Sequence, residues 1–179
     1  SLAGAAATTE LVLALSRRRK RISADQAHRL DDLLSLTQDL RASFMAAIDA
    51  DIASLTTLMN TQSELRQARK SSRGDLAEIE ERARVAIIDA LETPLSVARQ
   101  ADQLLQVVDE ARWTARTFTL SDLGAAAATT RGAIESLLLM AEVNLGLVKE
   151  ERYRAATMHE IDELFQRARE QSEAIVSAT

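Results

Sequence analysis

The chain has 179 residues, of which 46% are hydrophobic and 3% aromatic, and its formal net charge is −5. It contains no Cys, which excludes disulfides, thiolate nucleophiles and Cys-ligated metals, and its negative charge argues against a broad nucleic-acid surface. Strong helix formers dominate the composition. They predict an all-α fold, a single domain over residues 1–179 built as an antiparallel bundle of five to six helices.

The same reading bears on location. No apolar run reaches about 18 residues, so we expect no membrane-spanning helix. The lack of Cys fits a reducing compartment, and we expect a cytoplasmic protein. An apolar start followed by a basic run has the reverse order of a signal peptide.

The first predicted helix covers residues 2–15, which are apolar almost all round and are expected to be buried on most sides or in a subunit interface. Glu10 is expected at its rim. The basic run of residues 17–21 follows, and two interpretations stay open. It is either a solvated helix end, whose cations face the negative end of the helix dipole, or an anion-binding site.

Residues 23–70 hold neither Gly nor Pro and begin with the capping box Ser23-Ala24-Asp25-Gln26, so they predict one long helix, or two with a bend. Asp51 projects into the apolar sector of this helix, whereas Asp49 projects well away from it. A carboxylate on a buried stripe is costly unless it is hydrogen-bonded or charge-paired. Asp51 is therefore either an edge residue paired to an Arg or a functional group.

The next helix is expected to begin at Asp75, its cap. Thr93-Pro94 then starts a new helix or continues the previous one with a kink, as far as about Trp113. The connection that follows holds Trp113 and Phe118. These rings are expected to plug the end of the bundle or, alternatively, to form a wall for a planar ligand.

A long helix poor in side-chain bulk is predicted from Ser121 onward, with Ser121 as its N-cap and Asp122 in its first turn, where free backbone N–H groups hold a carboxylate. Small residues step by four along one face, and Asn144 lies further along the same row. Such a row lets another helix approach closely or leaves space for a ligand. Its members are Gly124, Ala128, Gly132 and Ser136.

The last helix is expected to start at the capping box Thr157-Met158-His159-Glu160. His159 is expected on its surface and has no metal-ligand spacing to His28, so we expect no metal site. The sequence also lacks a Gly-rich phosphate or dinucleotide loop, a nucleophile elbow and an HExxH motif.

Four short segments are similar to motifs of one enzyme family. They are Ile48-Asp49-Ala50-Asp51-Ile52-Ala53 (an acidic D-x-D-A-type segment), Thr93-Pro94-Leu95 (V-P-L), Ser121-Asp122-Leu123-Gly124-Ala125-Ala126 (S-D-x-G-x-A-A) and Val143-Asn144-Leu145 (the end of N-V-x-I-N-L). Their order and spacing resemble the cyclodeaminase/cyclohydrolase family of folate enzymes over nearly the whole chain. This family includes the cyclodeaminase domain of formiminotransferase-cyclodeaminase and a bacterial methenyltetrahydrofolate cyclohydrolase.

The chain departs from the family pattern at three places. The family's Gly-rich P-G-G-G-S loop is not in the sequence, its G-K-K-K-Y segment is represented only by Arg17 to Arg21, and the first Asn of N-V-x-I-N falls at Met140. These elements belong to the family's substrate contacts. The alternative to an active enzyme is therefore a family-shaped, non-catalytic helical dimer or interaction module.

The resemblance implies a helical homodimer that binds folate in a cleft near the dimer interface. It implies chemistry at the one-carbon bridge between N5 and N10, either water attack on 5,10-methenyltetrahydrofolate or loss of ammonia from 5-formiminotetrahydrofolate. A tetrahydrofolate derivative would be the substrate, with no further cofactor and with neither nucleic acid nor membrane as a partner.

The resemblance also suggests the site residues. Asp122 would stay ionised and face the cationic one-carbon unit, and Asp51, on an apolar face that favours the neutral acid, would carry the proton, although the two roles can be exchanged. The remaining candidates are substrate contacts: Ser121, Gly124 and Asn144 in the cleft, and Arg19, Lys20 and Arg21 at the glutamate tail of folate.

Overall fold

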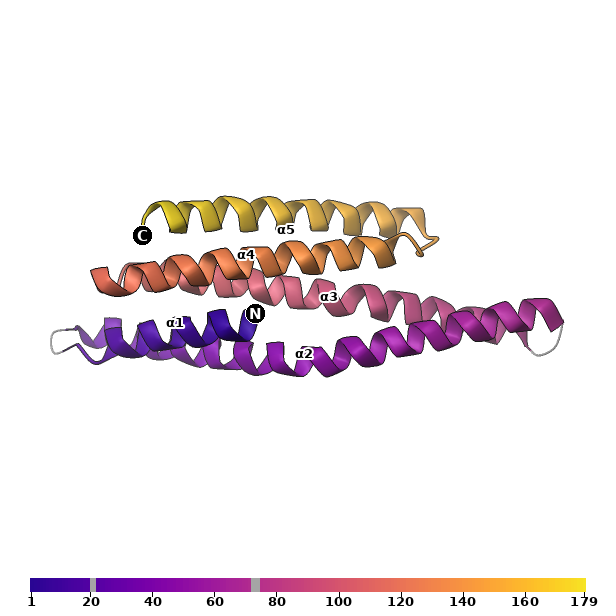
Figure 1. The fold of residues 1–179 in the computed structure, drawn as a ribbon, viewed down its shortest axis with the longest axis horizontal. Helices are drawn as coiled ribbons and strands as arrows, with labels where there is room; N and C mark the ends of the chain where they lie inside the picture. Colours follow the sequence, from indigo (N-terminus) through magenta and orange to yellow (C-terminus); the bar gives the residue numbers. More distant parts are fainter. Residues whose placement is uncertain (20–21, 72–74) are drawn as a thin grey trace.

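The computed structural model describes residues 1–19, 22–71 and 75–179, and Figure 1 shows these residues as a bundle of long helices. The helices are α1 (Leu2–Arg17), α2 (Ala24–Ser71), α3 (Leu76–Arg112), α4 (Thr117–Leu145) and α5 (Glu151–Ser177). The described residues contain no strand. The predicted all-α fold is confirmed, with five helices.

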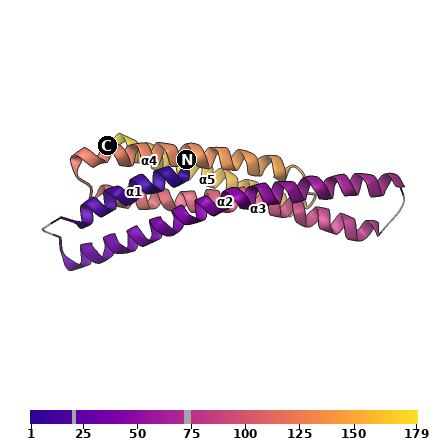
Figure 2. The same cartoon turned by 60° about the horizontal axis from the view of Figure 1, so that its bottom comes forward.

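The helices differ in length, and this sets the shape of the molecule. In Figures 1 and 2, α2 and α3 form a long antiparallel hairpin that extends past the α4–α5 connection at one end. The shorter α1 lies against α2, α3 and α4. Its N-terminus lies partway along the bundle, so α1 covers only the first part of α2.

A main cluster of buried aliphatic side chains joins all five helices. Apart from Phe44, it is built from Leu, Ile, Val and Ala, because the chain has few aromatic residues to fill space. Its largest fully buried members include Leu13, Leu30, Leu104, Ile134 and Leu164, one from each helix. A second, smaller cluster of Leu58, Ala86 and Ala90 holds α2 to α3.

Two predicted helix starts are confirmed by their hydrogen bonds. The Ser23 N–H donates to Gln26 Oε1 and the Gln26 N–H donates to Ser23 Oγ, both at 3.1 Å, which closes the capping box of α2. Asp75 Oδ1 accepts from the Glu78 N–H at 3.4 Å and caps α3. Between them, α2 runs as one continuous helix.

Pro94 lies inside α3, so the continuation alternative is right and no new helix starts at Thr93. Proline has no N–H, and the carbonyl of Ala90 one turn earlier therefore loses its usual donor. The side-chain amide of Asn144 supplies the missing donor, with Nδ2 at 2.8 Å from the Ala90 oxygen. This contact ties α4 to α3 at the proline.

Two predicted helix starts are wrong. The helix α4 begins at Thr117 rather than at Ser121, because Thr119 Oγ1 accepts from the Arg116 N–H at 3.2 Å and closes a turn earlier in the chain. Asp122 therefore lies in the second turn. The helix α5 begins at Glu151, and Thr157 is buried inside it.

Trp113 and Phe118 do not plug the bundle, since their exposed fractions are 80% and 66%. The guanidinium groups of Arg112 and Arg116 lie over these rings, at 5.2 and 5.8 Å from the ring centres. Polar contacts hold this end instead. The Thr114 carbonyl accepts from Ser16 Oγ at 3.0 Å and from Arg19 Nη1 at 2.9 Å.

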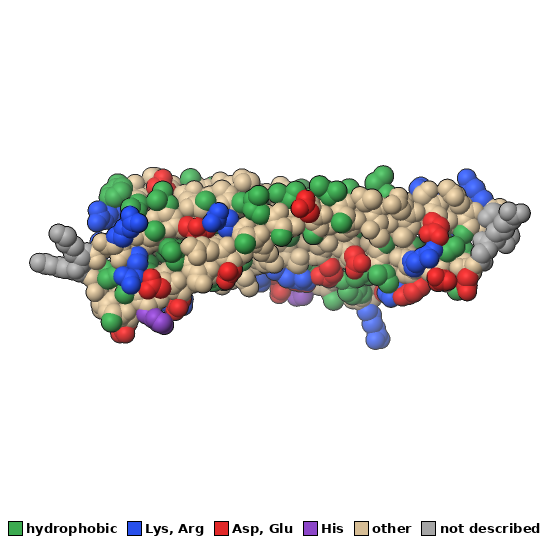
Figure 3. Space-filling view, turned by 90° about the horizontal axis from the view of Figure 1, so that it is seen from below, with side chains coloured by type: hydrophobic (Ala, Val, Ile, Leu, Met, Phe, Trp, Pro, Cys, Tyr) green, Lys and Arg blue, Asp and Glu red, His purple; other side chains and the backbone are tan. Residues whose placement is uncertain are grey.

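The length of α1 leaves part of α2 uncovered. Phe44, beside α1, is buried, whereas Ile48, Ile52 and Leu55 further along α2 are 56%, 61% and 50% exposed. We call these three residues, with Met59, the open strip of α2. Figure 3 shows hydrophobic side chains along the upper edge of this view, while acidic and basic side chains gather at the two ends and along the lower edge.

By length and composition alone, α2 is also the one helix in the described part of the chain that could span a membrane. Its most apolar 18-residue window has a mean hydropathy of 1.2 and is 11% buried. Two helices pack against α2, namely α1 and α3. The absence of a membrane span stays a prediction.

Candidate functional site

Contacts between neighbouring helices fix which residues lie at the same level of the bundle. Ser43 of α2 donates to Gln100 of α3, and Asn144 of α4 donates to Ala90 of α3. The pair Arg41–Glu10 sets the level of α1 against α2. It also confirms that Glu10 lies at the rim of α1 with a charge partner, at 2.6 Å.

These levels separate the two candidate carboxylates within one subunit. Counting along the helices from the contacts above, Asp51 lies level with Glu92 of α3 and Glu142 of α4, whereas Asp122 lies level with Arg112 of α3. The two levels are about 20 residues apart, or roughly 30 Å at the rise of an α-helix. A pair of acid–base groups must come within hydrogen-bond reach of one reacting centre, so one subunit cannot supply both to it.

Asp51 lies just beyond the N-terminal end of α1, on the core-facing side of α2. It is half-buried, because α1 ends at this level and does not cover it. Among the residues that the structure describes, the Asp51 carboxylate has no ion pair or hydrogen bond, and Ser54 Oγ bonds only its backbone carbonyl. The predicted pairing to an Arg is therefore not observed.

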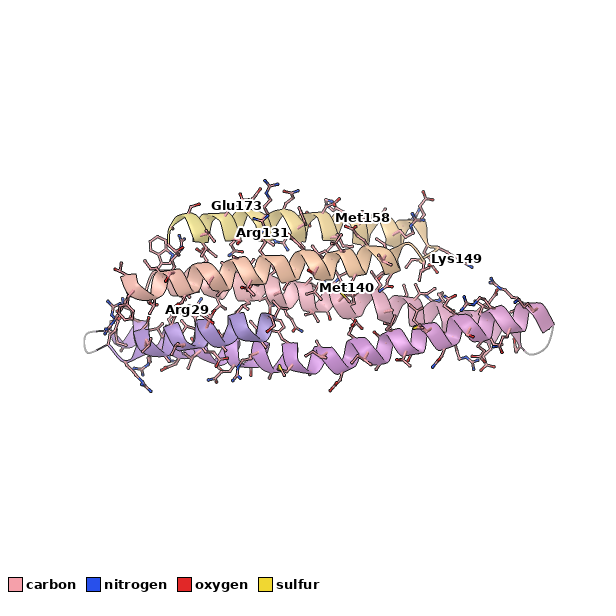
Figure 4. The ribbon with its side chains drawn as sticks, in the orientation of Figure 1. Arg29, Arg131, Met140, Lys149, Met158 and Glu173 are labelled. Carbon is pink, nitrogen blue, oxygen red and sulfur yellow. The ribbon has the colours of Figure 1, made fainter. Side chains whose placement is uncertain are left out.

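Asn144 lies close to the same level, with its amide nitrogen committed to the Ala90 carbonyl. Met140, at the position of the family's first Asn, is one turn earlier on α4 and exposed. Figure 4 shows Met140 on the side of α4 that faces α2, beyond the N-terminus of α1. Asp51 on α2 and Met140 and Asn144 on α4 thus lie at about one level, beside the N-terminal end of α1, on two helices that do not contact each other.

Ser121 and Asp122 lie near the other end of α4. Ser121 is exposed and Asp122 half-buried. Gly124 is buried, and a Cβ atom there would lie 2.6 Å from Thr179 Oγ1, so this glycine makes room for Thr179, which follows α5. Asp122 and Asn144, both predicted site residues, are on the same helix but about 33 Å apart along its axis.

Cations gather at the Asp122 end. Arg17 pairs with Asp31 and Arg29 with Glu110, and hydrogen bonds from these guanidinium groups lower the pKa of both carboxyl groups. Two of the cations are therefore neutralised by acidic partners. Arg19 lies at this end too, through its bond to Thr114, while Lys20 and Arg21 lie outside the described residues.

A cavity of about 500 Å³ lies elsewhere, where the α2–α3 hairpin passes the α4–α5 connection. Its floor includes Leu65, Ile87 and Val148, and ion-paired residues such as Arg69 and Glu80 form part of its wall. None of the predicted site residues that the structure describes lines it.

Sequence reasoning missed one unusual carboxylate. Asp102 of α3 is only 6% exposed, and its Oδ1 has no hydrogen-bond partner. Its Oδ2 lies 3.4 Å from Arg167 Nη2 of α5 and 3.5 Å from Gln106 Nε2. The signal was an Asp among apolar residues of a helix, the same signal that singled out Asp51. Because Asp102 faces α5, it belongs to neither candidate site.

Comparisons with known proteins give a family match and a structural match, whereas the comparison with curated sequences gives none. The family model for formiminotransferase-cyclodeaminase matches residues 1–163. The crystal structure of formiminotetrahydrofolate cyclodeaminase from Thermotoga maritima superposes with a TM-score of 0.82 at 16% sequence identity, over 99% of this chain and 82% of that one. At this identity the structural likeness shows a shared fold. No curated protein sequence matches the chain.

The matched region contains all the segments that hold Asp51, Asp122 and Asn144. It also contains α1 to α4 entirely and part of α5. By this match over most of its length, the chain belongs to the formiminotransferase-cyclodeaminase family.

Proposed function

We propose that this protein is a folate one-carbon enzyme that acts on the N5–N10 bridge, as a 5,10-methenyltetrahydrofolate cyclohydrolase or a 5-formiminotetrahydrofolate cyclodeaminase. The observation that carries the proposal is the family match over residues 1–163. The fold shared with the Thermotoga cyclodeaminase supports it. We also propose that the protein is cytoplasmic and that it uses no cofactor beyond its folate substrate.

Both reactions suit a pair of carboxylates. In the cyclohydrolase reaction, water adds to the cationic methenyl carbon and a base takes one of its protons. The bond from the carbon to N5 then breaks, and N5 takes up the remaining hydroxyl proton as the 10-formyl carbonyl forms. In the cyclodeaminase reaction, N10 attacks the formimino carbon and gives its proton to a base. The former imino nitrogen takes up two protons and leaves as ammonia as the methenyl bridge closes. A carboxylate near the bridge stabilises the cationic carbon, and a second one moves the proton.

The site is proposed to lie between two subunits. Asp51 and Asp122 are about 30 Å apart along one bundle, so they can act on one substrate only if they come from different chains. The pH dependence of turnover in the Asp51 and Asp122 variants would show which of the two carboxyl groups carries the proton. In one subunit Asp51 is half-buried, and its apolar cover therefore has to come from a partner or the substrate.

The first test substitutes the two carboxylates. Asp51→Asn and Asp122→Asn should each lower turnover by at least about 100-fold, the usual size of a general acid–base contribution. Asp49→Asn and Asp162→Asn, which alter exposed aspartates on α2 and α5, are the matched controls and should keep wild-type turnover. Near-wild-type turnover in both site variants would rule out this assignment.

The choice between the two reactions needs both substrates. Release of ammonia from 5-formiminotetrahydrofolate identifies a cyclodeaminase, and formation of 10-formyltetrahydrofolate from the methenyl compound without ammonia identifies a cyclohydrolase. Neither activity, together with no folate binding by calorimetry, would favour the alternative of a non-catalytic dimer. The observation that favours a non-catalytic dimer is Met140, an exposed residue at the position where the family pattern has an Asn.

Arg19 is the described member of the basic run proposed to meet the glutamate tail of folate. It is exposed and lies at the Asp122 end of the bundle. Arg19→Ala should raise KM several-fold for polyglutamylated substrate, because each extra carboxylate loses a cationic partner, and change KM for the monoglutamate less. Equal changes for both substrates would remove this role.

A further inference from the structure

The connection between α3 and α4 carries two large aromatic rings in water. Trp113 directly follows α3, Phe118 lies in the first turn of α4, and these residues are 80% and 66% exposed. Among the three Phe, one Tyr and one Trp of the chain, they are the most exposed. A ring that stays in water contributes no burial energy to the fold. The packing of the bundle therefore does not account for two rings at this place.

Both rings are held in position. The guanidinium of Arg112 lies 5.2 Å from the centre of the Trp113 ring, and that of Arg116 lies 5.8 Å from the centre of the Phe118 ring. A cation–π contact of this kind covers one face of a ring. Two hydrogen bonds from α1 to the Thr114 carbonyl fix the backbone between the rings. Each exposed ring thus keeps an open face on which a planar group can stack.

Cations without acidic partners lie beside the same connection. In the part of the chain that the structure describes, Arg17 pairs with an acidic side chain, whereas Arg18, Arg19 and Arg116 have no ion pair. All three are exposed, and Figure 3 shows basic side chains at this end of the molecule, on the left. Arg19 uses only one of its five N–H groups, for the bond to Thr114. These guanidinium groups can therefore meet the carboxylates of a ligand.

Phe118 also shares a row of α4 with Asp122, the carboxylate proposed to face the one-carbon unit. The two residues are four positions apart, so they lie on one side of the helix, about 5.4 Å apart along its axis. Ser121 and Ala125, which neighbour this row, are exposed. Along α4 the surface thus presents the cation of Arg116, then the ring of Phe118, then the carboxylate of Asp122.

We propose that Trp113 and Phe118 form a stacking platform for the benzoyl ring of the folate substrate, with Arg18, Arg19 and Arg116 facing its glutamate tail. We call Trp113 and Phe118 the aromatic platform. This inference rests on the proposed function for the identity of the ligand. It rests on the exposed rings and the unpaired cations for the place where the ligand binds.

The order of the groups in folate matches their order on the protein. The one-carbon bridge ends at N10, which is bonded directly to the benzoyl ring, and that ring is bonded in turn to the glutamate tail. With the bridge at Asp122, the benzoyl ring lies about one helical turn away, where Phe118 is, and the tail extends toward the cations. A planar ring joined to an anionic tail is the chemistry that exposed rings and free guanidinium groups recognise.

The first experiment uses fluorescence, because Trp113 is the only Trp of the chain and its emission reports on the platform. Wild-type protein is titrated with p-aminobenzoyl-triglutamate, which contains the ring and the tail of folate without the pterin. Stacking should quench the emission, and Phe118→Ala should raise the Kd at least about fivefold. Phe165→Ala, which removes a partly exposed ring on α5, is the control and should leave the Kd unchanged. Unchanged emission of the wild type would overturn the proposal.

Partial ligands separate the ring from the tail. Neutral p-aminobenzamide keeps the ring and triglutamate keeps the tail, and each should bind at least about tenfold more weakly than the joined ligand. Arg18→Ala should weaken binding of the joined ligand and leave binding of p-aminobenzamide unchanged, because only the tail carries carboxylates. Stronger quenching by ATP than by the joined ligand would contradict the folate ring as the occupant.

Steady-state kinetics test the platform in the proposed reaction. Phe118→Ala should raise KM for the folate substrate at least about fivefold and leave kcat nearly unchanged, because the ring is bound equally in the ground state and the transition state. Phe118→Trp keeps a stacking ring and should restore KM. Both changes are at an exposed position and should leave the fold intact. A fall in kcat at constant KM would contradict the stacking role.

Failure of the platform and failure of the proposed function give different results. Binding of the joined ligand by a protein that turns over neither folate substrate would support the platform and contradict the proposed reaction. Turnover without quenching, and without an effect of Phe118→Ala on KM, would contradict the platform alone.

Discussion

At the scale of single residues, Asn144 shows how a predicted substrate contact can also have a structural task. Its amide nitrogen donates to the carbonyl that Pro94 leaves without a helix partner. Ala90 itself is buried, so water cannot easily replace this donor. The pair joins two residues that are 54 positions apart in the sequence.

Asn144→Ala should destabilise the fold by about 1–3 kcal/mol, the cost of leaving a buried carbonyl unsatisfied. In a Pro94→Ala background the cost should be smaller, because residue 94 then has an N–H for the Ala90 oxygen. Urea unfolding of the two single variants and the double variant measures this coupling. Purely additive effects would show that the Asn144 bond does not compensate for the proline.

Met140 offers a gain-of-function test at the same site. Met140→Asn restores the amide of the family pattern near the level of Asp51, and it should raise kcat/KM for the folate substrate without loss of stability, since Met140 is exposed. Leu139→Asn, at the neighbouring position of α4, is the control and should not raise it. If Met140→Asn leaves kcat/KM unchanged, residue 140 does not contact substrate.

The sequence predicted on which side of α2 the Asp51 side chain lies, but not how exposed that side chain is. Helical periodicity placed it on the core-facing side of α2, where the structure has it. Its burial depends on where α1 ends, and this is a property of how two helices align rather than of local spacing. The sequence also could not predict the distance between Asp51 and Asp122. The order of motifs along the chain does not determine how far along the bundle axis each motif lies.

At the scale of elements, a capping box predicted a helix start correctly only where it follows a connection. Ser23 and Gln26 follow a connection, and their capping box starts α2. Thr157 to Glu160 has the same pattern, but Glu151 to Ala156 are already helical and Tyr153 anchors them by donating its hydroxyl to Glu92 at 2.7 Å. This tertiary contact keeps the residues before Thr157 helical, so α5 begins earlier in the chain than its capping box predicts.

The contact between α3 and α5 is also polar and should be sensitive to acid. Arg99 donates to Glu160 at 2.6 Å and to Glu92 at 2.9 Å, and the hydrogen bond from Arg99 lowers the pKa of Glu160. A carboxyl whose pKa is lower in the folded state stabilises the fold above its unfolded pKa. This contribution is lost as the pH falls through the folded pKa.

Wild-type protein should therefore lose more stability between about pH 5 and about pH 3 than Glu160→Gln does. The difference should be at most about 1 kcal/mol, because both partners of the ion pair are partly exposed. Urea unfolding at each pH measures it, and Glu170→Gln, an exposed residue of the same helix, is the control. Parallel pH profiles for wild type and Glu160→Gln would contradict this role of the pair.

At the scale of the whole molecule, the bundle divides into a thick part and a two-helix extension. The composition and periodicity predicted helices and a common core, and both are present. They did not predict that α2 and α3 extend beyond the other helices, because the lengths of separate helices are not coupled in the sequence. In the extension, the buried side chains are few and small apart from Leu58 and Leu65.

The extension should open more easily than the rest of the bundle. Amides of residues 60–68 and 78–86 should exchange with deuterium at least about tenfold faster than those of residues 95–111, a difference of about 1.4 kcal/mol in opening free energy. Fewer apolar contacts hold these amides, since α2 packs against α3 alone there.

Leu65→Ala should then speed exchange within the extension and leave protection around Leu104 unchanged. Leu104→Ala, in the main core, should lower protection everywhere by about 2–5 kcal/mol. Equal loss of protection throughout the chain in Leu65→Ala would show that the bundle opens as one cooperative unit.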